Sequence, residues 1–150
     1  MKIIKLLILS IFLTIFIIYS SIPITANIIP ILYNIIGIVF SIGMGLIITF
    51  SMSGIENKNY ILKIRRNIKH IRNNSITLFS ICTILLIVFS NIKFYYIYNI
   101  NIRQSMLIFT TIFFLLSIVY FILNFIKLQE LNEEIFDRVL KEKTSNKNQV

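Results

Sequence analysis

The chain alternates long apolar segments with short polar ones, and the first apolar segment is too long for a single membrane-crossing helix. No charged residue occurs between Leu6 and Ile55. As one helix this segment would extend about 75 Å, whereas the hydrocarbon core of a bilayer is about 30 Å thick. Turn-forming residues in 20–30, including two prolines, predict that the chain folds back there. The segment therefore predicts two transmembrane helices, at about 4–19 and 31–52.

Two more uncharged segments, 76–92 and 106–126, are each long enough to cross a bilayer as a helix. The polar segment 56–74 carries isoleucines spaced three and four residues apart, a pattern typical of an amphipathic helix. Asn73–Ser75 are expected to end this helix and to cap the next one. We expect the amphipathic helix either to lie on the inner leaflet or to dock on another amphipathic helix. Its isoleucines are Ile61, Ile64, Ile68 and Ile71.

Small residues recur every four positions along the second apolar segment, which makes it a candidate for close helix packing. The row has two interpretations: a contact with the protein's own helices, or the interface of a homo-oligomer. The pattern also favours one helix from about Ile35 to Arg72, uncharged in its first half and basic in its second. The row consists of Gly37, Ser41, Gly45, Thr49 and Ser53.

The C-terminal tail, 127–150, is predicted to continue as an amphipathic helix that frays from about Thr144. Its acidic residues are opposite in charge to the basic residues of 56–74 and lie beside an apolar stripe. We therefore expect the two helices to pair inside the cell, stripe on stripe and charge beside charge. The candidate interaction residues are Lys63, Arg65, Arg66, Lys69, Arg72, Glu130, Glu133, Glu134 and Asp137.

The composition identifies a membrane protein and its charge distribution predicts an orientation. The chain is 57% hydrophobic and only 14% charged, far from the balance of soluble domains. Its net charge of +9 lies mostly at the ends of the apolar segments. With the N-terminus inside, only Lys93 and Arg103 of the 15 basic residues are outside, as the positive-inside rule requires. The expected location is the cell (inner) membrane, with both termini cytoplasmic. The basic residues are expected to contact anionic lipids of the inner leaflet and not nucleic acid.

Three local features have alternative interpretations. Residues 1–26 also resemble a cleavable signal peptide, whose removal would leave three helices in the same orientation. Tyrosines in 95–98 are expected at the headgroup level as an aromatic belt, or form a surface that receives an external peptide or lipid. His70 is expected to face headgroups, the alternative being a charge that responds to pH.

The expected fold is an all-α membrane protein: four transmembrane helices in two hairpins, a basic cytoplasmic amphipathic helix and a cytoplasmic C-terminal helix. Apart from Lys5 at the start of the first one, the predicted transmembrane segments lack charged residues and His, and the chain has one cysteine, Cys82, so no catalytic, metal or cofactor site is expected. A protein of this kind needs a protein partner, a second copy or the bilayer as its target. The favoured function is a membrane effector or immunity component of a toxin, bacteriocin or phage-defence system. An accessory subunit of a larger complex and a small oligomeric transporter are the alternatives.

Overall fold

In the computed structural model, four helices and a two-stranded hairpin make up the described residues, which are 3–19, 25–49, 58–91, 96–97 and 100–147. The helices are α1 (Ile3–Tyr19), α2 (Ile28–Thr49), α3 (Lys58–Asn91) and α4 (Ile102–Lys147). The strands are β1 (Tyr96–Ile97) and β2 (Ile100–Asn101), which pair antiparallel. The all-α class is therefore confirmed for the described residues, with this short hairpin as an unforeseen addition.

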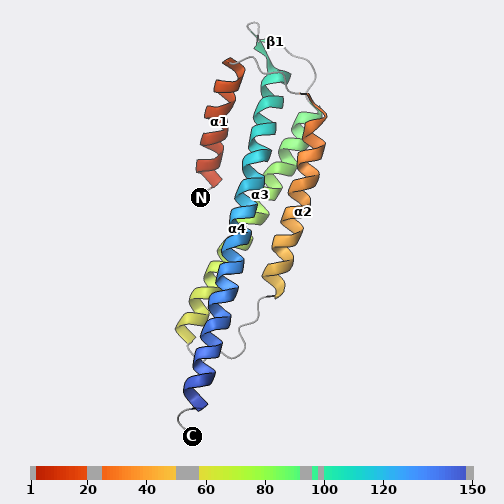
Figure 1. Cartoon of the computed structure of the whole chain (residues 1–150). Coiled ribbons are helices and arrows are strands. Elements are labelled where there is room, and N and C mark those ends of the chain that lie inside the picture. Colours follow the sequence, from red (N-terminus) through yellow and green to blue (C-terminus); the bar gives the residue numbers. More distant parts are fainter. Residues whose placement is uncertain (1–2, 20–24, 50–57, 92–95, 98–99, 148–150) are drawn as a thin grey trace.

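The helices alternate in direction and form a four-helix bundle at one end of an elongated molecule (Figure 1). Below the start of α1, the first part of α3 and the last part of α4 continue side by side, and the last turns of α2 lie beside their upper part. We call this part, residues 58–72 of α3 and 128–147 of α4, the paired extension. α1 begins at mid-height, where the bundle ends, whereas the chain's C-terminal end lies at the tip of the paired extension (Figure 1).

α4 is the central helix of the bundle, because it contacts each of the other three. The buried core combines side chains from all four helices, and its aromatic rings stack: Phe40 of α2 lies 4.4 Å from Phe79 of α3 between ring centroids. Aromatic pairs of this kind stabilise a core by about 1 kcal/mol beyond the area that they bury. The largest buried core residues are Leu6, Ile29, Ile36, Leu78, Phe113 and Phe114.

The single helix predicted from Ile35 to Arg72 is wrong. α2 ends at Thr49, and α3 begins at Lys58 and runs back alongside it. Ile47 packs on the cluster that contains Ile64, although 17 residues of continuous helix would separate the two by about 26 Å. The reason is packing, since folding back buries apolar faces of both segments that one long helix would leave uncovered.

The predicted boundary at Asn73–Ser75 is also wrong, because α3 continues through it without a break. The buried side chains of α3 follow one stripe across this point, from Ile68 through Ser75 to Leu78. The hydroxyl of Thr77 donates a hydrogen bond to the carbonyl oxygen of Asn73 at 3.0 Å, so this polar side chain is satisfied within the helix. Asn and Ser cost only a few tenths of a kcal/mol inside a helix, and a continuous packed face outweighs that cost. An amphipathic helix lying flat on a leaflet is thus excluded, since it shares its axis with the next segment.

Three helices are long and apolar enough to cross a membrane: α2, α3 and α4. α1 has 17 residues and is shorter, although its bounds agree with the predicted first segment. α2 begins at Ile28, so Pro30 lies in the first turn of the helix and not in the preceding turn. This position suits proline, because the first backbone N–H groups of a helix have no partner within it.

α4 extends the predicted fourth segment in both directions. It begins at Ile102, directly after β2, and continues to Lys147. The prediction that the tail continues as a helix is confirmed. The helix was expected to fray from Thr144, but α4 extends to Lys147. Thr144 contributes to this, since its hydroxyl donates to the carbonyl oxygen of Leu140 at 3.1 Å.

Candidate functional site on the paired extension

The paired extension is held together by an apolar seam that the sequence pattern foresaw. Ile64 and Ile68 of α3 and Ile135 of α4 are buried, with exposed fractions of 2%, 9% and 4%. Ile61, Leu131 and Val139 pack against them. The three- and four-residue spacing places these side chains on one face of each helix, so the two stripes meet along the whole extension.

Tyr60 closes the seam on its polar side, and sequence reasoning missed it. Its hydroxyl donates a hydrogen bond to Oε1 of Glu134 at 2.9 Å, and the guanidinium of Arg138 lies 4.0 Å from the centre of its ring. Burial raises the pKa of the Tyr60 phenol, and the hydrogen bond to Glu134 and its charge act in the same direction, while Arg138 acts against them. The i, i+4 spacing of Glu134 and Arg138 could have indicated a shared partner on another helix.

The charged candidate residues lie outside this seam. Lys63, Arg65, Arg66, Lys69 and Arg72 are exposed along α3, and so are the four acidic candidates on α4. Among those acidic residues, Glu134 also contacts the opposite helix, through Tyr60. The charged side chains of the extension therefore lie on the solvent-exposed faces of the two helices, and the isoleucines lie on the faces that pack together. These acidic candidates are Glu130, Glu133, Glu134 and Asp137.

The glycines in the row of small residues on α2 are not in close contact with any other described part of the chain. A Cβ atom added at Gly37 or Gly45 would meet nothing within 4 Å. Ser41 and Thr49 are exposed, and the hydroxyl of each donates a hydrogen bond to a backbone carbonyl oxygen of α2. The interpretation as an intramolecular contact therefore does not hold at the two glycines. The last member of the row, Ser53, lies outside the described residues.

Small polar residues are instead buried in α1 and α4. α1 buries Ser10 and Thr14 at helical spacing and packs mainly on α4, not on α2 as the expected first hairpin required. α4 buries Thr110, Thr111 and Ser117. The hydroxyls of Thr110 and Thr111 have no hydrogen-bond partner among the described residues. Buried small residues are thus present on α1 and α4, and not on the helix that carries the predicted row.

The remaining candidates lie apart from the paired extension or at its upper end. Cys82 is buried in the bundle and its Sγ donates to Oγ of Ser117 at 3.6 Å. His70 is exposed, and its Nε2 lies 3.1 Å from Nδ2 of Asn74. The tyrosine cluster falls mostly outside the described residues, apart from Tyr96 on β1. Within the described part of the chain, no group of three His, Cys, Asp or Glu side chains could hold a metal ion.

The arrangement couples the paired extension mechanically to the bundle. α3 and α4 each run without interruption from the extension into the core, where Leu78, Phe113 and Phe114 are buried. A packed core does not deform continuously, so a shift of one helix in the extension must be transmitted along its axis. A ligand or partner held by the extension would therefore act on the bundle through these two helices.

Comparisons of the chain with protein-family models, with curated proteins and with solved structures found no match.

Proposed function

We propose that the protein is a non-enzymatic multi-pass membrane protein that binds a partner through its paired extension and transmits this event to the bundle. The class that this fits is a membrane effector or immunity component of a toxin, bacteriocin or phage-defence system. The observation that carries the proposal is the continuity of α3 and α4 from an exposed, charged helix pair into a tightly packed apolar core.

The surface of the bundle supports its placement in a bilayer. Large apolar side chains are exposed around it, including Phe12 at 69%, Ile38 at 61% and Val119 at 52%. Water-soluble proteins rarely expose apolar patches of more than a few hundred Å², whereas lipid tails accept such side chains. Three helices of sufficient length and apolar character add to this support.

The level of the polar residues supports an orientation with both termini in the cytoplasm. Lys5 and Lys127 are the charged residues next to the uncharged parts of α1 and α4, Asn74 lies at the end of the polar segment 56–74, and all three line one pocket. Three segment ends that are far apart in sequence thus meet at one depth, which fits a single membrane boundary. The basic residues of α3 lie beyond this boundary, where the positive-inside rule places the cytoplasm.

Induced expression in bacterial cells with a membrane-potential dye tests the proposal. We expect depolarisation or growth arrest, and we expect Gly37→Leu with Gly45→Leu to abolish it while insertion in the membrane persists. The space beside both glycines lets the chain itself accommodate the leucines, so a loss would report on assembly with other helices. The control is Ile42→Leu, which keeps an exposed apolar residue on α2. An immunity component would instead be silent alone and protect against a co-expressed toxin.

The open row on α2 favours a second candidate, an accessory subunit of a membrane complex. Gly37 and Gly45 leave a surface on which a helix of another protein could lie closely. Silent expression together with membrane subunits that co-purify, and that are lost with the leucine variants, would support this function. Uptake or efflux of a defined solute would support the remaining alternative, an oligomeric transporter.

A further inference from the structure

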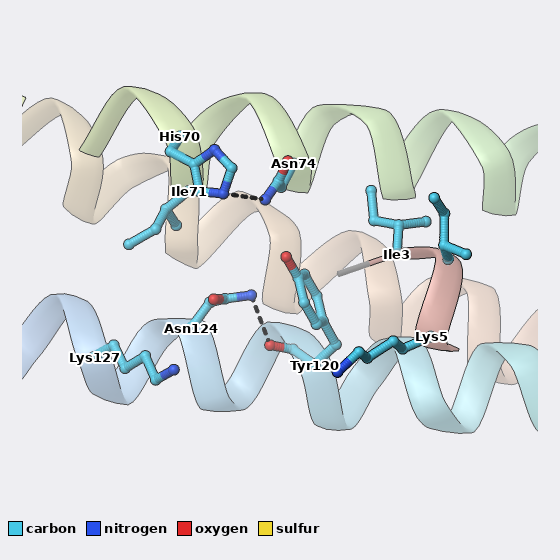
Figure 2. Close-up of a pocket in the computed structure, with 9 residues that line it drawn as sticks. Ile3, Lys5, His70, Ile71, Asn74, Tyr120, Asn124 and Lys127 are labelled. Atoms are coloured by element: carbon cyan, nitrogen blue, oxygen red, sulfur yellow. Dashed lines mark hydrogen bonds between the residues drawn. The ribbon is translucent and has the colours of Figure 1, made fainter. Parts of the chain in front are cut away.

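A half-open pocket of about 780 Å³ lies where the lower end of α1 meets α3 and α4 (Figure 2). Sequence reasoning did not foresee it, because its lining comes from three segments that are far apart in the sequence. The lining has an apolar part, made by isoleucines, and a polar part. It consists of Ile3, Ile4, Lys5, His70, Ile71, Asn74, Tyr120, Asn124 and Lys127.

The polar part of the lining is rich in hydrogen-bond donors and contains no carboxylate. Figure 2 shows the ammonium groups of Lys5 and Lys127 extending toward each other from opposite ends of the pocket. Asn74 and Asn124 contribute side-chain amides. The amide of Asn124 donates one hydrogen bond to the backbone oxygen of Tyr120 at 3.0 Å. Two lysines from different helices with no acidic residue between them make the pocket attractive to an anion.

Tyr120 adds a neutral hydrogen-bond donor to the lining of the pocket. Its side chain is only 4% exposed, and its hydroxyl points away from α4 toward α3, into the pocket (Figure 2). None of the described residues forms a hydrogen bond with this hydroxyl. The hydroxyl faces the half-open pocket, so it is available to donate a hydrogen bond to an acceptor bound there.

We propose that this pocket binds an anionic phosphate group, carried by a phospholipid headgroup or free in the cytoplasm. Lys5 and Lys127 neutralise the charge, and the Tyr120 hydroxyl donates to a phosphate oxygen. The isoleucines at the rim, Ile3 and Ile4, lie beside the apolar segment of α1, where the glycerol and first acyl carbons of a lipid would continue. The inference rests on the proposed placement in a membrane, which puts the pocket at the inner headgroup level.

The test uses the purified full chain in detergent, titrated with phosphatidylglycerol or with phosphatidylcholine, and counts bound lipid by native mass spectrometry. We expect preferential retention of phosphatidylglycerol, reduced about tenfold in the double variant Lys5→Gln with Lys127→Gln. The matched control is Lys63→Gln with Lys141→Gln, which removes two lysines that do not line the pocket and should retain the lipid. Tyr120→Phe keeps the ring and should lower retention by a smaller factor.

Competition with inorganic phosphate separates the two sources. Displacement of the lipid by phosphate, or phosphate binding that the double variant loses, would assign the pocket to free phosphate. Equal retention of the two lipids, or equal loss in the control variant, would overturn the proposal if phosphate also fails to bind. Carbonate extraction of membranes separates this test from the test of the proposed function. Release of the protein into the carbonate supernatant would contradict the placement in a membrane. Retention in the membrane without anion binding would contradict only the proposed binding site. Circular dichroism confirms that each variant folds.

Discussion

At the scale of single residues, Tyr60 shows how a polar side chain can join two helices without an ion pair. It sits at the start of α3, yet it reaches Glu134 and Arg138 on α4, 74 and 78 positions later in the chain. Its ring covers the edge of the isoleucine seam and its hydroxyl satisfies a carboxylate. Aromatic residues with a polar tip suit such boundaries, because one end is apolar and the other is hydrated.

The raised pKa of Tyr60 predicts how the helix pair responds to alkaline pH. The neutral phenol is favoured in the folded chain, so its contribution to stability is complete below the ordinary tyrosine pKa of 10.0 and is lost as pH rises through the higher folded value. The difference in absorbance at 295 nm between the wild type and Tyr60→Phe isolates one of the seven tyrosines. We expect this difference to titrate above pH 10.0 in the folded protein and near it in denaturant. A folded titration at or below 10.0 would show that the Glu134 contact is not formed in solution.

At the scale of elements, α3 combines two segments of opposite character in one helix. Its first half is basic and its second half is apolar, but the buried stripe from Ile64 to Cys82 keeps one helical register through both. The stripe changes partners along the way, from Ile135 of α4 in the extension to the aromatic residues of the bundle. Shared partners on α4 hold both halves of α3 on one axis.

The seam predicts which substitutions separate the paired extension. Ile135→Ala removes a side chain that is 4% exposed and should destabilise the extension by about 2–4 kcal/mol, since a buried isoleucine leaves a cavity. Limited proteolysis measures this as faster cleavage of the C-terminal part of α4, with the bundle still protected. The neighbouring control, Phe136→Ala, changes a residue that is 64% exposed and should shift stability by no more than about 0.5 kcal/mol.

Arg65→Glu gives a further contrast, because this residue is exposed outside the seam. A surface charge contributes little to helix pairing, so its reversal should leave the protease pattern close to that of the wild type. If Arg65→Glu exposed the tail as much as Ile135→Ala, the charges and not the isoleucines would hold the pair together.

At the scale of the whole molecule, the four helices differ in how far they extend along its long axis. All four take part in the bundle, α2 reaches the upper part of the paired extension through Ile47, and α3 and α4 continue furthest (Figure 1). The pocket that contains Lys5 and Lys127 marks the level at which this change occurs. The proposed membrane boundary therefore lies near the start of α1 and the upper end of the paired extension, where the end of α2 also packs through Ile47.

This geometry predicts the accessibility of single cysteines introduced in the chain. Cys82 is buried, so Cys82→Ser provides a background without a reactive thiol. In that background we expect Arg66→Cys to react with an impermeant maleimide only after the cells are permeabilised, because residue 66 is exposed on the cytoplasmic side of the proposed boundary. Asn91→Cys, which is exposed at the opposite end of α3, should react in intact cells. Reaction of Arg66→Cys in intact cells would invert the proposed orientation.

The apolar segments and the stripes on the two amphipathic segments were predictable, because each depends on residues near one another in sequence. The first segment was predicted within one residue of α1, and the seam between Ile64, Ile68 and Ile135 follows from helical spacing alone. The uninterrupted course of α3 was not predictable from Asn73–Ser75, because local propensity there favours a cap and only tertiary packing outweighs it. The partner of α1 and the role of Tyr60 were missed for a similar reason, since nothing in a single segment identifies its neighbour.

The sequence by itself determined that the chain is helical, where its apolar segments lie, and which end of each segment carries positive charge. These properties follow from hydropathy and spacing, which act over a few turns of helix. Only the tertiary structure decided that α1 packs on α4, that the glycines of α2 stay uncovered, and that Lys5, Tyr120 and Lys127 line one pocket. Such contacts depend on the fit of side chains from distant segments, and that fit is a property of the assembled bundle.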